Sequence, residues 1–459
     1  TTTDVFTKAI DESLSYDFIK TLELARELRK EYFMRLNPSV IFIRAAQHPN
    51  RGEFNKENPG LMRKIGYDLI IRPDDITNQF DYYMWLNVTK KGLPSIVKRV
   101  WADSLSDFDA YRIKKYKSKS LVDLVRISHA KSEVIDELMT TGDVKVDEKS
   151  STWETLRSKG MGWVDILNTI KMPHMALLRN LRGIFTEVED LDLAKDVCEL
   201  LKSGVINGKQ FPFRYYTAYK ALQEGVNHYG LLRDTLEECM DLSIENTPKL
   251  KGKTICLSDN SGSAHGTLNS EYGSTKVAEI GNLSSIMTSV QSDEGYVGVF
   301  GDNLSIKPTS KRNGILTQLE ETNSRGLLQG MGTENGIWIF FRDAIKDKTH
   351  YDNIFIYSDM QANHSQLFGI NPSEYSEFVK GKSHIDVFKL LLEYKRTVNP
   401  KVNYFSVQTA GYDNSLVTIN LERGGVLSGW TGKETTFAKS IIDIWDDVEK
   451  VKENKKEVQ

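Results

Sequence analysis

The sequence predicts a chain of two parts: an all-α array over residues 1–250, followed by a doubly wound, mainly parallel α/β domain over residues 251–459. Three observations carry this prediction. Apolar residues in the first part recur at the three-to-four spacing of a helix face. In the second part, short apolar strands alternate with helical stretches. Finally, 459 residues exceed what one ordinary hydrophobic core encloses, so more than one domain is expected.

The first part is predicted to be helical throughout. Beginning near residue 17, one helix face is apolar, with Ser15 or Asp17 available as its N-cap. That face comprises Phe18, Leu22, Ala25, Leu28 and Tyr32. Similar patterns continue as far as RYYTAYKALQEGV and are separated by turn signals such as NPG and NGKQFP. The result is an irregular array of paired helices without a strict repeat period.

The second part begins after Leu250 with a set of buried strands. The predicted strands are KTICLSD, YVGVFGD, NIFIYSD, VNYFSVQ and SLVTINL, and the first three end in aspartate. A helix in SHIDVFKLLLEYKRTVNP separates the third from the fourth, with Ser383 as its cap, Asp386 at the capping-box position and a proline stop. Functional sites are expected at the carboxyl ends of such strands.

Composition and charge exclude several classes of protein. With 39% hydrophobic and 27% charged residues and a net charge of −3, the chain is typical of a soluble globular protein and not of a general nucleic-acid coat. The spacings of Cys198, Cys239 and Cys256 match neither a zinc knuckle nor a disulfide framework, so a reducing cytoplasm is expected. No signal-peptide pattern or bilayer-length apolar run is present, so neither secretion nor a membrane partner is expected.

Residues 257–266, LSDNSGSAHG, carry oxygen-bearing side chains at alternate positions directly after an apolar run. In a loop leaving a strand, Asp259, Ser261 and Ser263 can turn their oxygens the same way. Thr333 in LLQGMGTENG and Asp359 in NIFIYSDMQ add donors at neighbouring strand ends. Hard oxygen donors suit Mg²⁺. The two carboxylates just balance a divalent cation, which leaves an open position for an outside carboxylate or another anion.

Rival chemistries for this stretch each lack a required part. A nucleophile elbow needs glycines two positions before and after the serine, and neither Ser261 nor Ser263 has both. A phosphate-binding loop needs Gly-Lys-Ser/Thr, and an Asp-x-Asp phosphotransferase needs an acid at position 261. His265 is too close in sequence for the usual geometry of serine activation. A turn that caps the next helix remains an alternative for DNSGS alone. Thr333 and Asp359 favour the metal site.

The segment YRIKKYKSKS concentrates positive charge and contains no acid. A run of this kind is more often a solvated helix face or loop than a binding site. The neighbouring Tyr111 and Tyr116 can either stack on bases or pack the helix. The basic residues of this cluster are Arg112, Lys114, Lys115, Lys117 and Lys119.

Two resemblances connect these motifs. Asp259-x-Ser261-x-Ser263 with Thr333 and Asp359 resembles the metal-ion-dependent adhesion site of a von Willebrand factor A domain, over roughly residues 251–459. In the helical part, KKYKSKSLVDLVRISHAKS, MPHMALLRNLRGI and QFPFRYYTAYKAL resemble the TROVE module of the Ro autoantigen family. Members of that family are RNA-binding proteins in which this module precedes an A domain, which is the domain order found here.

The resemblance implies a ring of HEAT-like helix pairs closed by the A domain. It also implies that single-stranded 3′ ends of misfolded or defective noncoding RNAs enter the central hole and that small structured Y-like RNAs bind the outer surface. An exoribonuclease is the partner implied by bacterial members of the family. The RNA-binding residues that it implies are Arg112, Lys115, Lys117, Lys119 and His129. Lys119 stands where family members commonly carry arginine, which weakens a bidentate phosphate contact. A shorter segment between Lys119 and Asp123 leaves the placement of Lys119 relative to His129 open.

We therefore expect a cytoplasmic, non-catalytic RNA-binding protein that acts in RNA quality control or a stress response and carries a divalent metal ion, Mg²⁺, at the five oxygen donors. The alternative is a metal-dependent protein–protein interaction module, in which the helical array is a scaffold and an acidic protein ligand binds the metal. A ring formed within one chain needs no partner subunit, so a monomer is expected.

Overall fold

The structure, a computed structural model, describes residues 2–86, 92–146, 152–222, 225–270, 273–360, 386–409, 416, 421–429 and 432–457. The chain divides into two compact units, Thr1–Leu156 and Arg157–Gln459. The change of fold class lies elsewhere, at Leu250, where the first strand begins. Helices precede this strand and a mainly parallel sheet with helices follows it, which confirms the predicted fold class.

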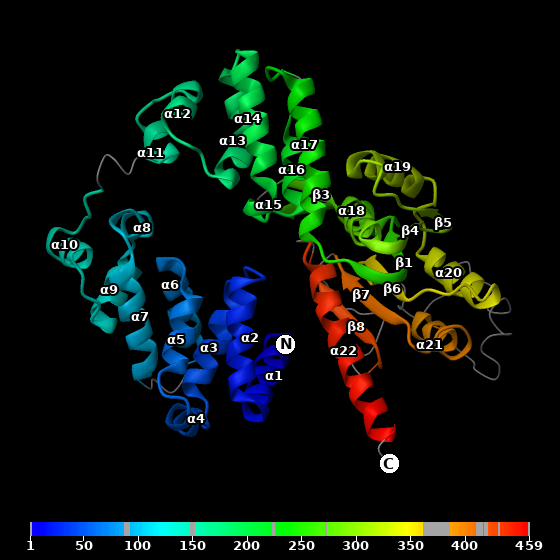
Figure 1. Cartoon of the computed structure of the whole chain (residues 1–459), viewed down its shortest axis with the longest axis horizontal. Helices are drawn as coiled ribbons and strands as arrows, with labels where there is room; N and C mark the ends of the chain where they lie inside the picture. The colour runs from blue at the N-terminus through cyan, green and yellow to red at the C-terminus, as the bar shows by residue number, and fades with distance from the viewer. Residues whose placement is uncertain are drawn as a thin grey trace. The chain divides into compact units, whose positions relative to one another are not determined.

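In the first unit, the secondary structure of the described residues is entirely helical (Figure 1). Neighbouring helices pack in pairs, such as α2 (Phe18–Lys30) with α3 (Leu36–Gln47), around a buried core that includes Phe42 and Trp101. Of the two predicted caps, Ser15 and Asp17, the structure shows Asp17, whose side chain accepts a hydrogen bond from the Lys20 amide at 2.9 Å. The helices are α1 (Thr2–Tyr16), α2 (Phe18–Lys30), α3 (Leu36–Gln47), α4 (Arg51–Glu57), α5 (Leu61–Leu69), α6 (Pro73–Leu86), α7 (Ser95–Asp107), α8 (Ala110–Lys115), α9 (Lys119–Ser128) and α10 (Glu133–Thr141).

Helices continue into the second unit before the sheet begins. They are α11 (Trp153–Ser158), which crosses the boundary, α12 (Trp163–Thr169), α13 (His174–Glu187), α14 (Leu191–Ser203), α15 (Val205–Gly208), α16 (Pro212–Ala221), α17 (Tyr229–Ser243) and the 3-10 helix η2 (Ile244–Asn246). His174 and Tyr215 join α13 to α16 through a hydrogen bond of 2.7 Å between the ring Nε2 and the phenol oxygen. Among the described residues, no helix is both long and apolar enough to cross a membrane.

The sheet has the order β5-β4-β1-β6-β7-β8. All neighbours run parallel except β4 and β5, which are antiparallel. The strands are β1 (Leu250–Asp259), β4 (Ser292–Phe300), β5 (Leu304–Pro308), β6 (Asn353–Ser358), β7 (Asn403–Gln408) and β8 (Gly424–Ser428), with a separate hairpin of β2 (Thr267–Ser270) and β3 (Gly273–Lys276). Four predicted strands are confirmed as β1, β4, β6 and β7. The fifth, SLVTINL, lies almost entirely outside the described residues.

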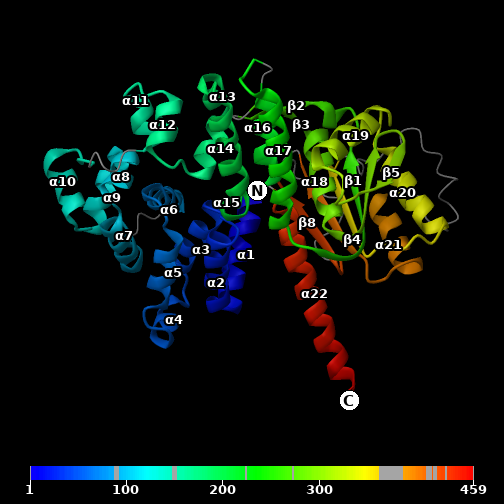
Figure 2. The same ribbon diagram turned by 45° about the horizontal axis from the view of Figure 1, so that its top comes forward.

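Helices cover both faces of the sheet (Figure 2). Alternate residues of β1 face opposite sides of the sheet. Leu257 therefore packs in the core beneath α20 (Asn335–Lys346) and α21 (Val387–Thr397), whereas Cys256 packs in the core beneath α22 (Glu434–Glu457). The helices are α18 (Val277–Val290), α19 (Ile315–Leu327), α20 (Asn335–Lys346), α21 (Val387–Thr397) and α22 (Glu434–Glu457). The N-cap of α21 is Asp386, which accepts from the Lys389 amide at 2.7 Å; the predicted cap Ser383 lies outside the described residues.

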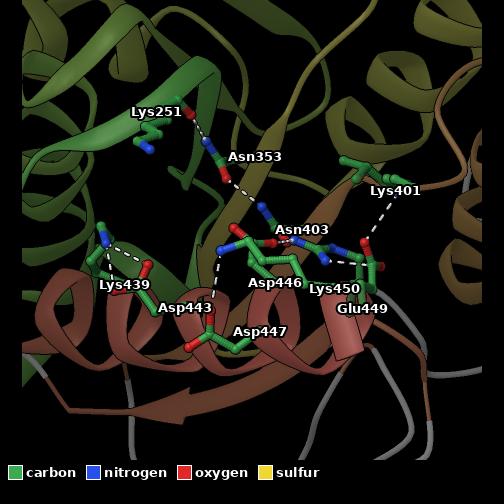
Figure 3. Close-up of polar contacts among 12 residues, drawn as sticks. Lys251, Asn353, Lys401, Asn403, Lys439, Asp443, Asp446, Asp447, Glu449 and Lys450 are labelled. Atoms are coloured by element: carbon green, nitrogen blue, oxygen red, sulfur yellow. Dashed lines mark hydrogen bonds and ion pairs between the residues drawn. The ribbon is translucent and has the colours of Figure 1, made fainter. Parts of the chain in front are cut away.

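A chain of polar contacts ties the amino ends of the central strands to α22 (Figure 3). The Asn353 side-chain amide donates to the Lys251 carbonyl at 2.9 Å, and the Asn403 amide donates to the Asn353 side-chain oxygen at 2.8 Å. Arg423 donates to the Asn403 side chain at 2.9 Å and to Asp446 of α22 at 2.6 Å. This network lies at the amino ends of the strands. The carboxyl ends, where a site is expected, lie at the opposite end of the sheet.

Candidate functional site

The candidate metal site lies where the sheet changes direction of winding. The chain passes from β1 to β4 on one side and later returns to β6 on the other side of β1. Asp259 ends β1 and Asp359 directly follows β6. The two strands are parallel, with Ser258 opposite Tyr357, so both aspartates lie at the carboxyl end of the sheet. In open α/β sheets, ligands bind at such a switch point, outside the carboxyl ends of the strands.

Three carboxylates lie close together at the carboxyl end of the sheet. Asp259, Glu334 and Asp359 each offer an oxygen, and these atoms all lie within 4.8 Å of one another. Both aspartates are buried. Burial, and next the nearby charge of Asp359, raise the pKa of Asp259 to about 6, although hydrogen bonds from Ser261 and Ser358 oppose the change. The Ser358 hydroxyl donates to Asp259 Oδ2 at 2.9 Å, so part of the cluster is held in place by neutral donors.

The serines of the DNSGS loop are arranged beside Asp259. The Ser261 amide donates to Asp259 Oδ1 at 2.8 Å, and the Ser261 and Ser263 hydroxyl oxygens lie 3.2 Å apart. The Gly262 amide donates to the Met331 carbonyl at 3.0 Å, and a Cβ on Gly262 would lie only 2.8 Å from that oxygen. Glycine here allows the loop to approach the segment that carries Thr333. Ser263 also begins a short 3-10 helix, as the turn alternative predicts, and its role as a metal ligand stays a prediction.

Thr333 lies in the segment between α19 and α20, and not at a strand end as the sequence had predicted. It is oriented by Asp302, an acid that was not predicted to belong to the site. Its hydroxyl donates to Asp302 Oδ1 at 2.7 Å, and the Gly332 amide donates to Asp302 Oδ2 at 3.2 Å. Glu334, the next residue, is the one whose carboxylate joins Asp259 and Asp359. Two signals were available in the sequence: Asp302 ends the predicted strand YVGVFGD, and Glu334 directly follows Thr333.

The donor set fits a hard divalent cation. Carboxylate and hydroxyl oxygens are the ligands that Mg²⁺ and Ca²⁺ prefer, and the set contains neither a cysteine nor a histidine that would favour a softer metal. Three carboxylates together carry a charge of −3 when ionised. A divalent ion would therefore relieve their mutual repulsion as well as gain ligands.

The basic cluster at α8 and α9 is surrounded by acids from other segments. Lys115 Nζ lies 3.0 Å from Glu154, and Lys117 Nζ lies 3.3 Å from Asp143. Arg112 pairs with Asp109, the N-cap of α8, at 3.6 Å. The segment YRIKKYKSKS itself contains no acid, but in the folded chain acidic side chains from outside the segment lie beside its basic residues.

The two tyrosines of this segment are engaged within the protein. The Tyr111 hydroxyl donates to Glu154 at 2.7 Å, and the Arg72 guanidinium lies over the Tyr116 ring at 5.5 Å. Of the two alternatives for these rings, packing and pairing within the unit is the one that the structure favours over free stacking platforms.

Lys119 and His129 lie at opposite ends of α9. Lys119 is the first residue of the helix, after the Ser118 N-cap, and His129 is its C-cap in the left-handed conformation with φ 61°. A helix of ten residues spans about 15 Å, which sets their separation. Both are exposed, and neither side chain has an ion pair or hydrogen bond with another residue in the described part of the chain.

No protein-family model matches the sequence, and no curated protein matches it either. Among solved structures, the chain is similar to the crystal structure of the Deinococcus radiodurans Ro (RSR) protein. The TM-score is 0.65, and the match covers 94% of this chain and 93% of that chain at 14% sequence identity. The likeness shows a shared fold that extends over both units of the chain.

Proposed function

We propose that this chain is a non-catalytic RNA-binding protein that holds single-stranded ends of misfolded or defective noncoding RNAs and small structured Y-like RNAs. The observation that carries the proposal is the basic surface of α8 and α9, where exposed Lys119 and His129 lie about 15 Å apart on one helix. The fold shared with a Ro protein supports it. Lysines bind phosphates without regard to base identity, which suits RNAs recognised by an end or a shape.

The ion pairs of the basic cluster do not prevent this function. Lys115 and Glu154 have 41% and 43% of their side chains exposed, and Lys117 and Asp143 have 38% and 58% exposed. Exposed pairs of this kind contribute about 0–1 kcal/mol. An RNA phosphate can therefore replace the acid at small cost, while Lys119 is available without any exchange.

The test replaces Lys115, Lys119 and His129 with alanine in the full chain. Binding of an RNA hairpin with a single-stranded 3′ tail is titrated by fluorescence anisotropy at several salt concentrations. Affinity should fall, and the slope of log K against log salt should decrease by about 1.4, which is about 0.7 for each lysine. Loss of the His129 side chain is expected to lower the affinity further.

A matched control removes the same residue types elsewhere. Lys346, Lys348 and His350 are exposed in and after α20, and their triple alanine variant should bind the RNA as the native chain does. If the α8–α9 variant keeps the native affinity and slope, or if the control loses as much, the proposed RNA surface is wrong.

The second candidate function is a metal-dependent protein interaction module, whose metal would bind at the three carboxylates. Chelation separates the two. RNA binding through lysines should survive EDTA unchanged, whereas a protein ligand held on the metal should dissociate in pull-down experiments. An exoribonuclease that co-purifies through the shared RNA should instead be released by ribonuclease.

A further inference from the structure

Glu334 is held beside Asp259 and Asp359 by the contacts of the residues that flank it in the chain. It is the N-cap of α20, which runs for twelve residues behind it. On one side Thr333 is held by Asp302, and on the other the Gly336 amide donates to the Gly301 carbonyl at 2.8 Å. A Cβ on Gly336 would lie 2.3 Å from the Asn303 carbonyl oxygen, so the first turn of α20 is clamped against the end of β4.

The clamp directs the Glu334 carboxylate towards Asp259 and Asp359. One oxygen of each carboxylate lies within 4.8 Å of the other two, a spacing that a single cation can bridge. The Ser358 hydroxyl, which donates to Asp259 at 2.9 Å, also reaches Glu334 Oε2 at 3.4 Å. The same hydroxyl thus borders two carboxylates that come from different segments of the chain.

We propose that Glu334 is a resident third carboxylate ligand of a divalent cation bound with Asp259 and Asp359, and that it occupies the place of an outside acidic ligand. With only the two aspartates, a divalent ion is just neutralised and retains an open position for an external carboxylate. With Glu334, the occupied site carries a net charge of −1. This negative charge repels a further carboxylate, so the carboxylate ligands of the cation all come from this chain.

Mn²⁺ serves as the probe, because it is paramagnetic and accepts the same oxygen ligands. Binding to the full chain is followed by electron paramagnetic resonance for the native protein, Glu334→Gln and Glu320→Gln. Glu334→Gln should weaken Mn²⁺ binding by about tenfold or more, since even the loss of a group that only supports a ligand costs about 10–100-fold. Glu320→Gln removes an exposed acid of α19 in the same unit and should bind Mn²⁺ as the native chain does.

A second arm uses acetate as a free carboxylate. In Glu334→Ala, acetate should strengthen Mn²⁺ binding several-fold, because it fills the vacated position. In the native protein, acetate at the same concentration should leave the Mn²⁺ affinity unchanged. Because this arm includes the native chain, it tests the proposal even if a variant fails to fold.

Three results would overturn the proposal: no Mn²⁺ binding to the native chain at millimolar concentration, native affinity in Glu334→Gln, or acetate-enhanced binding in the native chain. None of them bears on RNA binding by α8 and α9. RNA titration of Glu334→Gln, which should match the native protein, separates a failure here from a failure of the proposed function.

Discussion

His174 shows how one side chain can make stability depend on pH. Its ring is held in a slot where a Cβ on Gly204 would lie 2.3 Å from Nδ1 and a Cβ on Gly208 would lie 2.6 Å from Cδ2. Nδ1 is buried without a hydrogen-bond partner among the described residues. Burial lowers the pKa of His174 below its ordinary value of 6.5, because a protonated ring would bury an unsatisfied N–H.

This lowered pKa predicts acid sensitivity. The stabilisation from neutral His174 is complete above the unfolded-state pKa of 6.5 and is lost as the pH falls through the lower pKa of the folded state. His174→Gln, which cannot titrate, should therefore lose less unfolding free energy than the native chain between pH 7.5 and pH 5. Urea denaturation at the two pH values measures the difference. Equal losses in both proteins would show that another group causes the pH dependence.

At the scale of the element, the start of α21 is set by a single side chain. Asp386 accepts the Lys389 amide at 2.7 Å, and the helix that follows buries Leu390, Leu391 and Tyr394 against the sheet. The capping bond satisfies an amide that the helix itself cannot satisfy. This element therefore depends on its cap as well as on its apolar face.

Asp386→Ala should lower the free energy of unfolding by about 1 kcal/mol, the usual cost of losing an N-cap. Chemical denaturation measures the loss, and hydrogen exchange should show it first in Val387–Thr397. Asp447→Ala on α22 is the control, since that side chain is 75% exposed and forms an exposed ion pair with Lys450. A control variant as unstable as the cap variant would contradict the capping argument.

The strands that sequence patterns predicted are the buried ones. β6, β7 and the second half of β1 are continuous buried runs, and such runs are recognisable without knowledge of their neighbours. β5 and β8 lie at the two edges of the sheet and were not predicted. Their sequences, LSIKP and GGVLS, are short and contain proline or glycine, so only pairing with β4 or β7 makes them strands.

At the scale of the whole molecule, the chain has separate hydrophobic cores. Among the described residues, one core is formed by side chains between Ile10 and Val144. The two cores on either side of the sheet are formed by side chains between Leu250 and Ile442. A ligand that binds only the folded form of one region stabilises that region against local unfolding, because unfolding would release the ligand. Stabilisation by metal should therefore be confined to the unit that holds the carboxylates.

Hydrogen exchange followed by mass spectrometry tests this expectation. Adding Mn²⁺ should slow exchange in peptides around β1, β6 and the start of α20, and leave peptides from α2 to α9 unchanged. Removal of the metal by EDTA should restore the original rates. Equal protection across both units would mean that they respond to the metal as one cooperative body.

The sequence by itself determined the order of the two fold classes, the buried strands, and two aspartates and two serines placed at strand ends. Periodicity and strand-end position are local properties, and parallel strands bring their carboxyl ends to one edge whatever their exact register. The RNA-contact residues and the full ligand set remain predictions that the proposed experiments test.

Only the tertiary structure decided which charges meet. Glu334 joins Asp259 and Asp359 because the first turn of α20 is clamped to the end of β4, and Thr333 turns to Asp302 for the same reason. Lys115 and Lys117 meet Glu154 and Asp143 across 39 and 26 residues of sequence. Charge pairing depends on distance in space, and a linear sequence does not contain that distance until the chain has packed.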